Sequence, residues 1–164
     1  GICQASTTVY RAALKAGLPI VRQRNHSLYV TYYEAKGVGL DATVFPGQQD
    51  LLFLNDTGAP LLLQAKHDGD DVTVNIFGRP DGRTVTLDGP FFSKNMAADF
   101  TLGGRTLKRN EIGWLRTVRS PNGEEHQNVL VSVYKELPKS LAGRWTATSQ
   151  VFGQPQQELL AAGQ

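Results

Sequence analysis

Cys3 is the only cysteine of the chain, and its type and position make it the first candidate for chemistry. The pattern predicts a helix over 4–16, which puts Cys3 at the head of that helix. Free N–H groups and the helix dipole at such an end stabilise an anion, and a thiolate is the nucleophilic form of cysteine. A cysteine nucleophile also needs a base within reach, and His26 is the nearest histidine in the sequence.

The spacing allows Cys3 and His26 to meet. A helix of 13 residues is about 20 Å long, and the stretch from Leu18 to His26 spans up to about 30 Å when extended. The chain can therefore double back and bring the histidine to the cysteine. The alternative is a small buried cysteine near a helix end and a histidine that serves only its loop. Spacing alone leaves both open.

The predicted helix over 4–16 has an apolar stripe at helical spacing and a clear end. Arg11 and Lys15 lie on its other side, and Gly17 is suited to end it. Hydroxyl side chains in the first turn are suited to binding free N–H groups. The stripe consists of Ala5, Val9, Ala12, Ala13 and Ala16, and the hydroxyls are those of Ser6, Thr7 and Thr8.

Beyond the helix the apolar pattern changes to a period of two, which is typical of strands. A turn at 67–70 predicts a hairpin, and a second hairpin is predicted about a turn at 120–123. Residues 83–110 offer only short strand candidates between glycine and proline breaks. The strand segments are 28–33, 50–55, 60–66 and 72–77 in the first half, with 112–118 and 129–133 in the second.

These elements predict an α+β fold, with one N-terminal helix packed on mainly antiparallel β-sheet and a C-terminal β-hairpin extension. We divide the chain into a first unit over 1–80, a β-rich extension over 81–138 and a flexible tail over 139–164. Leu159 and Leu160 would give the tail one short helical turn.

Composition narrows the function classes. A net charge of +2 and 40% hydrophobic residues are ordinary for a soluble globular protein. The lysines are scattered, which argues against nucleic acid as a partner. No apolar stretch approaches the roughly 20 residues that a membrane span needs. Three histidines and one cysteine without ligand spacing predict no metal site, and nothing indicates another cofactor.

Three short segments resemble the VanW family of bacterial cell-envelope proteins: GICQASTTVY at 1–10, NHS at 25–27 and DATV at 41–44. The likeness covers about residues 1–78, including the apolar run into an Asn-x-Thr turn over 50–60. The chain departs from the family at Arg24, where a second histidine is common, and at Leu40, where a basic residue is often found. Family members usually carry a sizeable segment before the cysteine, so we expect a signal or anchor upstream of Gly1.

The resemblance implies cell-wall chemistry outside the cytoplasm. Some VanW-domain proteins are similar in function to L,D-transpeptidases, which use a cysteine to take an acyl group from a peptidoglycan stem peptide. Carried over by position, Cys3 is the nucleophile, His26 its base and Asp41 the group that orients the imidazole. Gln4 and Ser6 are assigned to the substrate or oxyanion.

Other assignments stay open at this stage. Gln4 is equally suited to a first-turn position facing water, and Ser6 to a helix cap. Transpeptidation and hydrolysis would use the same residues. The rival to both is a non-catalytic, β-rich envelope module that binds glycan or protein, because residues from 83 onward carry no catalytic group pattern.

Overall fold

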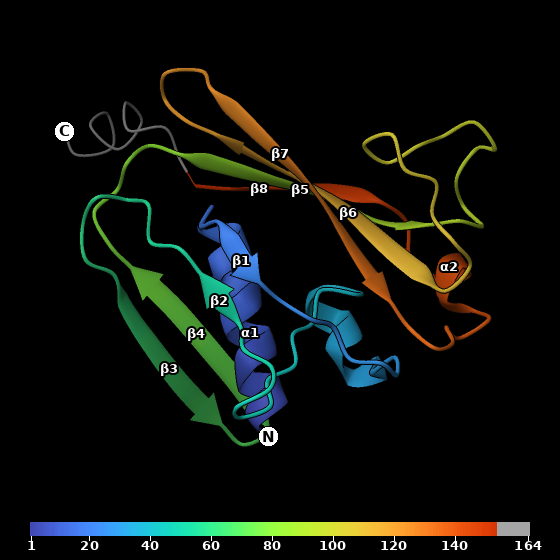
Figure 1. The fold of residues 1–164 in the computed structure, drawn as a ribbon, viewed down its shortest axis with the longest axis horizontal. Helices are drawn as coiled ribbons and strands as arrows, with labels where there is room; N and C mark the ends of the chain where they lie inside the picture. The colour runs from blue at the N-terminus through green and yellow to red at the C-terminus, as the bar shows by residue number, and fades with distance from the viewer. Residues whose placement is uncertain (154–164) are drawn as a thin grey trace.

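The computed structural model describes residues 1–153 and shows an α+β fold, as the sequence predicts. Figure 1 shows helix α1 beneath a four-stranded sheet, with a hairpin along its other side. The strands of the large sheet run in the order β7-β6-β5-β8, and every neighbouring pair is antiparallel. The helices are α1 (Ile2–Lys15), a 3₁₀ helix (Thr31–Lys36) and α2 (Leu141–Arg144); the strands are β1 (Ile20–Arg22), β2 (Leu52–Phe53), β3 (Leu62–Asp68), β4 (Asp71–Phe77), β5 (Thr84–Phe92), β6 (Glu111–Arg119), β7 (Glu125–Val133) and β8 (Thr148–Phe152).

Helix α1 begins at Ile2 and ends where glycine permits a left-handed residue. Cys3 therefore lies inside the first turn rather than ahead of it. Gly17 has φ +76°, and the N–H groups of Gly17 and Leu18 bond the carbonyls of Leu14 and Ala13. These two bonds satisfy carbonyls that the helix end would otherwise leave free. The predicted role of Gly17 is confirmed.

The buried face of α1 is not the predicted alanine stripe. Ala13 is buried and Lys15 is exposed, as predicted, but Ala5 is exposed and Arg11 is buried, so the predicted stripe is wrong at Ala5 and the predicted polar face is wrong at Arg11. The larger side chains decide which face is covered, since they remove more apolar area from water. The buried residues are Ser6, Thr7, Tyr10, Arg11, Ala13 and Leu14.

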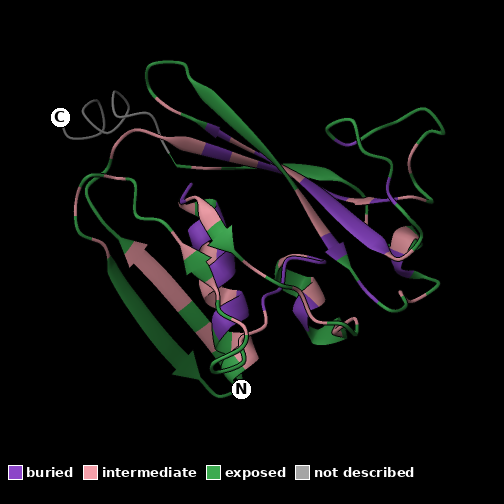
Figure 2. Cartoon of the chain, in the orientation of Figure 1, coloured by how far each residue is buried: buried purple, intermediate pink, exposed green. Residues whose placement is uncertain are grey.

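One hydrophobic core joins the first and second halves of the chain. Tyr10 and Leu14 of α1 pack in the same cluster as Val85 of β5 and Trp114 of β6. Figure 2 shows buried residues on α1 and on the strands that it faces. Val38, Leu40 and Ala42 from the first half lie in this cluster too. The units 1–80 and 81–138 thus share their packing in this structure.

Two arginines from the second half hold the C-terminal end of α1. The guanidinium of Arg116, on β6, donates to the carbonyls of Leu14 (3.1 Å) and Leu18 (2.9 Å). Arg83 donates to the Gly17 carbonyl at 3.0 Å. Cations are favoured at this end of a helix, where the dipole is negative. The large sheet therefore fixes the position of α1.

Both predicted hairpins are confirmed, with β3 pairing β4 and β6 pairing β7. The predicted strand over 28–33 was wrong, because the chain turns into the 3₁₀ helix from Thr31. Strand β5 runs through residues 84–92, where the sequence suggested only short strands. The tail predicted from Lys139 is ordered into α2 and β8, and Leu159 and Leu160 lie outside the described residues.

None of the helices within residues 1–153 is long and apolar enough to cross a membrane. The same residues contain no group of three or more His, Cys, Asp or Glu side chains that could hold a metal ion.

Candidate functional site

The first turn of α1 is bound to the extended segment 41–44. The Ser6 hydroxyl donates to the Ala42 carbonyl at 2.6 Å. Thr7 uses its hydroxyl twice, accepting from the Ala42 N–H at 3.1 Å and donating to the Ala42 carbonyl at 3.2 Å. The Cys3 thiol points to the Val44 carbonyl, with the sulfur 3.8 Å from the oxygen. The predicted capping of free helix N–H groups was wrong, because these hydroxyls bind the neighbouring segment.

Residues 23–26 run beside this same segment and bring His26 to Asp41. The N–H of Thr43 donates to the Arg24 carbonyl at 2.7 Å, and the Gln23 amide donates to the Asp41 carbonyl at 2.5 Å. These bonds fix the register of the two segments, in which the imidazole of His26 contacts the Asp41 carboxylate.

The His26–Asp41 pair is closely bonded and shielded. Oδ2 of Asp41 lies 2.5 Å from Nδ1 of the imidazole and also accepts the His26 backbone N–H at 2.7 Å. The Asp41 side chain is 4% exposed and that of His26 is 20% exposed. A carboxylate accepts only, so Nδ1 carries the proton and Nε2 has the free lone pair. This is the tautomer that a general base needs.

Asp41 has a second partner from the other half of the chain. The hydroxyl of Tyr134, just after β7, donates to Oδ1 of Asp41. The Tyr134 side chain is buried and stacks edge-on against Tyr29. Burial, with the Asp41 charge next in effect, raises the pKa of Tyr134 far above its usual value, so the phenol remains a donor. Both oxygens of Asp41 are therefore occupied.

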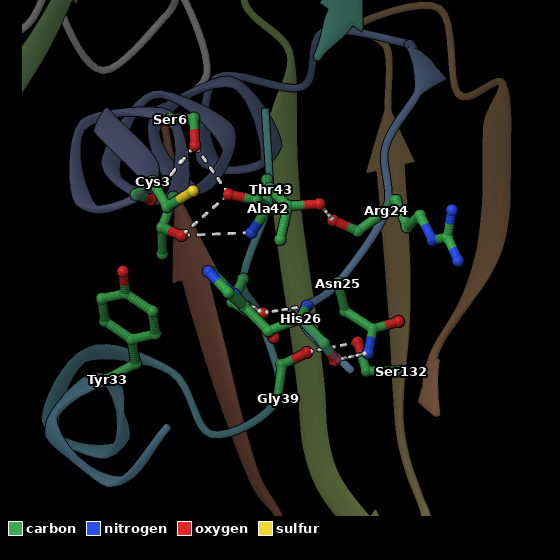
Figure 3. Close-up of polar contacts among 12 residues, drawn as sticks. Cys3, Ser6, Arg24, Asn25, His26, Tyr33, Gly39, Ala42, Thr43 and Ser132 are labelled. Atoms are coloured by element: carbon green, nitrogen blue, oxygen red, sulfur yellow. Dashed lines mark hydrogen bonds and ion pairs between the residues drawn. The ribbon is translucent and has the colours of Figure 1, made fainter. Parts of the chain in front are cut away.

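Strand β7, which Tyr134 follows, also holds the chain near Asp41 and next to His26. Ser132 donates from its hydroxyl to the Gly39 carbonyl at 2.6 Å. The Asn25 amide donates to the Val133 carbonyl at 2.8 Å, next to His26 in the sequence (Figure 3).

Tyr33 lies beside both Cys3 and His26. Its ring centroid is 5.6 Å from that of the imidazole. Burial above all, then Tyr32, raises the pKa of Tyr33; the Thr7 hydroxyl lowers it and the charge of Cys3 adds a further increase. Figure 3 shows the Tyr33 ring near the imidazole of His26, while the Cys3 sulfur points towards the segment that carries Ala42. Tyr33 thus packs beside the imidazole and lies within electrostatic range of Cys3.

The structure gives Gln4 and Ser6 other partners. The Gln4 side-chain amide donates to the Asp70 carbonyl at 2.6 Å, and its backbone N–H bonds the Gly1 carbonyl at 3.1 Å. Ser6 is buried and bonds Ala42 and the Cys3 carbonyl. An oxyanion role for either residue therefore needs one of these bonds to open.

Comparison with known proteins bears on this region. Residues 1–77 match the family model described as "VanW like protein". The first 77 residues form a VanW-like segment. Over 77 residues the chain is 38% identical to "Uncharacterized protein YoaR" of Bacillus subtilis (strain 168), an alignment that covers 47% of this chain and 24% of YoaR. The chain thus spans about a quarter of that relative, and no solved structure matches it significantly.

The VanW-like segment supplies Cys3, His26 and Asp41, but its site is supported from outside the segment. Tyr134 and Ser132 belong to the second half, which the match does not reach. Sequence reasoning missed both, since neither stands in a recognisable motif. The one available signal was Tyr134 itself, an aromatic polar residue directly after an alternating strand.

Proposed function

We propose that this chain is an acyl-transfer domain of L,D-transpeptidase type, which acts on peptidoglycan stem peptides outside the bacterial cytoplasm. The observation that carries this proposal is the Asp41–His26 pair, bonded to the segment on which the turn bearing Cys3 is docked. The VanW-like match supports a cell-envelope setting. A nucleophile, a base and a group that orients the base are the parts of a catalytic triad.

The reaction begins with proton transfer from the Cys3 thiol to Nε2 of His26. The thiolate then attacks the carbonyl carbon of a stem-peptide bond and forms a tetrahedral oxyanion. As the C–N bond breaks, the imidazolium returns its proton to the leaving amine, which leaves a thioester on Cys3. An acceptor amine, or water, then releases the acyl group by the same steps in reverse order. Asp41 stabilises the imidazolium in both halves of the reaction.

The thiol must turn for this reaction to start. In the described residues Cys3 bonds the Val44 carbonyl and has no hydrogen bond to His26. Catalytic hydrogen bonds are often formed only once substrate is bound. The side chain of Cys3 is half-buried, so a change of its rotamer is open to it.

Mass spectrometry of the intact protein tests this proposal. After incubation with a carbapenem or with a tetrapeptide stem, we expect a covalent adduct that maps to Cys3. Cys3→Ala should abolish the adduct, and His26→Asn should slow its formation by at least about a hundredfold. His67→Asn is the matched control, because His67 is an exposed histidine on β3. A protein that forms no adduct, or one that forms equally fast in His26→Asn, contradicts the proposal.

The second candidate is a non-catalytic envelope module. The bonds that Cys3 and Gln4 make to the carbonyls of Val44 and Asp70 favour it, since they are also what a purely structural helix end would make. Co-sedimentation with purified cell-wall sacculi separates the two. Binding that is unchanged in Cys3→Ala, without any adduct on Cys3, supports the module.

A further inference from the structure

Four cations from separate parts of the sequence meet at one end of the large sheet. They flank the last residues of β5, the first of β6 and the last of β7, which adjoin because neighbouring strands are antiparallel (Figure 1). Lysines that are scattered in the sequence thus become neighbours in space. We call these four residues the basic patch: Lys94 after β5, Arg109 before β6, and Lys135 and Lys139 after β7.

The basic patch surrounds a cavity of about 210 Å³. Glu136 is the one acidic residue among the described residues that line it, so the four cations leave the lining with a net charge of +3, whereas the whole chain has +2. Buried apolar side chains, among them Phe92 and Leu141, complete the lining. The cavity is smaller than the roughly 300 Å³ at which sites for whole small molecules begin, so it fits one anionic group of a larger partner.

No acidic side chain neutralises the basic patch. None of the ion pairs within residues 1–153 includes any of its four cations, all of which are exposed. Glu111, the acidic residue closest to Arg109 in the sequence, is buried and already accepts from Arg105 at 2.6 Å and from the Lys108 N–H at 2.8 Å. The gathering of four such cations around one cavity, rather than the lack of a partner at any one of them, makes this a site for an anion.

The lining fits a phosphate group better than a carboxylate or a nucleic acid. The oxygens of a phosphodiester do not lie in one plane with their substituents, so cations from several strands can approach them, whereas one arginine already occupies both oxygens of a planar carboxylate. Proteins that bind single-stranded nucleic acids also offer aromatic side chains on which the bases stack. Phe92, the aromatic residue of this lining, is only 4% exposed. The basic patch therefore offers charge without a stacking surface.

We propose that the basic patch binds a flexible phosphodiester polymer of the cell envelope. The patch adjoins the loop that carries His26, because the Lys135 N–H donates to the carbonyl of Ser27, the next residue, at 2.8 Å. A polymer bound there holds the domain to the envelope beside the candidate site. The inference goes beyond the proposed function: it uses the cell-envelope setting of the VanW-like segment and does not depend on acyl transfer.

Fluorescence anisotropy of an end-labelled poly(glycerol phosphate) chain, titrated with the whole protein, tests this inference. We expect binding at about 50 mM salt that weakens steeply by about 200 mM, because the bound cations displace counterions from the polymer. Arg109→Gln combined with Lys135→Gln should weaken binding at least about tenfold and lower the slope of log affinity against log salt by about two. Lys66→Gln combined with Arg79→Gln is the matched control, because it removes the same two charges at exposed positions outside the patch. It should bind as the wild type does.

Absence of binding, or equal affinities of the two double variants, overturns the inference. Tighter binding of a single-stranded DNA oligomer with the same number of phosphates overturns the choice of polymer, since the bases then contribute. The outcome is separable from that of the proposed function. A Cys3 adduct without polymer binding leaves acyl transfer standing and removes the polymer site, and polymer binding that depends on the basic patch, without any adduct, does the reverse.

Discussion

The phenol of Tyr134 donates to one oxygen of Asp41 while the other oxygen of the same carboxylate binds His26. The two residues are 93 positions apart, and only Asp41 lies in the VanW-like segment. Because both oxygens are occupied, the plane of the carboxylate is fixed, and with it the orientation of the imidazole. Tyr134 is thus a positioning residue for the candidate base.

Tyr134→Phe removes this donor with little change in shape. We expect Cys3 adduct formation to slow about tenfold, as is usual when the partner of an orienting group is lost. Stability should fall by about 1–3 kcal/mol, because a buried carboxylate oxygen loses its partner. Nitrogen NMR of the His26 ring separates positioning from stability, since only a positioning role changes the share of the Nδ1–H form. Tyr32→Phe, at an exposed neighbour of Tyr33, is the control; a ring spectrum of Tyr134→Phe that matches the wild type contradicts the assignment.

Asp41→Asn tests the tautomer directly. The amide can present an N–H to Nδ1 and so favour the imidazole form with the proton on Nε2, which then has no lone pair to accept a proton. We expect the rate of adduct formation on Cys3 to fall by at least about a hundredfold. The rate is measured by mass spectrometry at several times after mixing with a carbapenem. A rate within a factor of three of the wild type would show that Asp41 does not serve the base.

Arg116→Met probes the attachment of α1 to the sheet. The change removes a buried guanidinium and leaves the carbonyls of Leu14 and Leu18 without their donor. We expect a loss of about 1–3 kcal/mol in the free energy of unfolding, measured with urea. Arg119→Met removes an exposed arginine from the same strand and should change stability by less than about 1 kcal/mol. Similar losses in the two variants would refute this role for Arg116.

The Glu34–Arg144 pair predicts a defined pH dependence. The hydrogen bonds from Arg144 lower the pKa of Glu34 in the folded protein. Glu34 therefore stabilises the fold above its unfolded pKa of about 4.3, and this contribution is lost as the pH falls through the lower folded value. The stability difference between wild type and Glu34→Gln should be constant from pH 7 to about pH 5 and shrink below pH 4. Thermal melts of both proteins across this pH range measure the stability difference. A difference that grows on acidification would contradict the prediction.

A chain cut after residue 80 should not fold alone. Leu14 and Leu40 pack in one core with Val85 and Trp114, so the cut leaves their apolar surface in water. We expect the fragment to show no cooperative thermal transition by circular dichroism, whereas the whole chain shows one. A cooperative transition in the fragment would support the boundary that the sequence suggested at residue 80.

Local patterns in the sequence predicted the local parts of this fold. The α1 end at Gly17 and both hairpins follow from short-range signals, namely a permissive glycine and alternating apolar residues. Strand β5 was missed because Gly89 and Pro90 interrupt its pattern. In the structure the absence of a side chain at Gly89 is what lets the strand cross Trp114, since a Cβ there would lie 2.6 Å from the indole.

For the candidate site, too, the sequence predicted the residues in short local segments and missed the one that tertiary packing brings in. Cys3, His26 and Asp41 lie in short segments whose sequences resemble the VanW family, and the structure brings His26 and Asp41 into contact. Tyr134 reaches the site through tertiary packing alone. A hydrogen bond between residues so far apart leaves no periodic signal in the chain, so propensity and spacing could not reveal it.

The shared core bears on how such a segment can be inherited. A gene fusion that carries residues 1–77 into another protein would bring Cys3, His26 and Asp41, but not the phenol of Tyr134 or the guanidinium of Arg116. The recipient would have to offer its own hydrogen-bond donors at these two places. Recombination at this boundary would therefore yield a working chimaera only where the new neighbour already matches both.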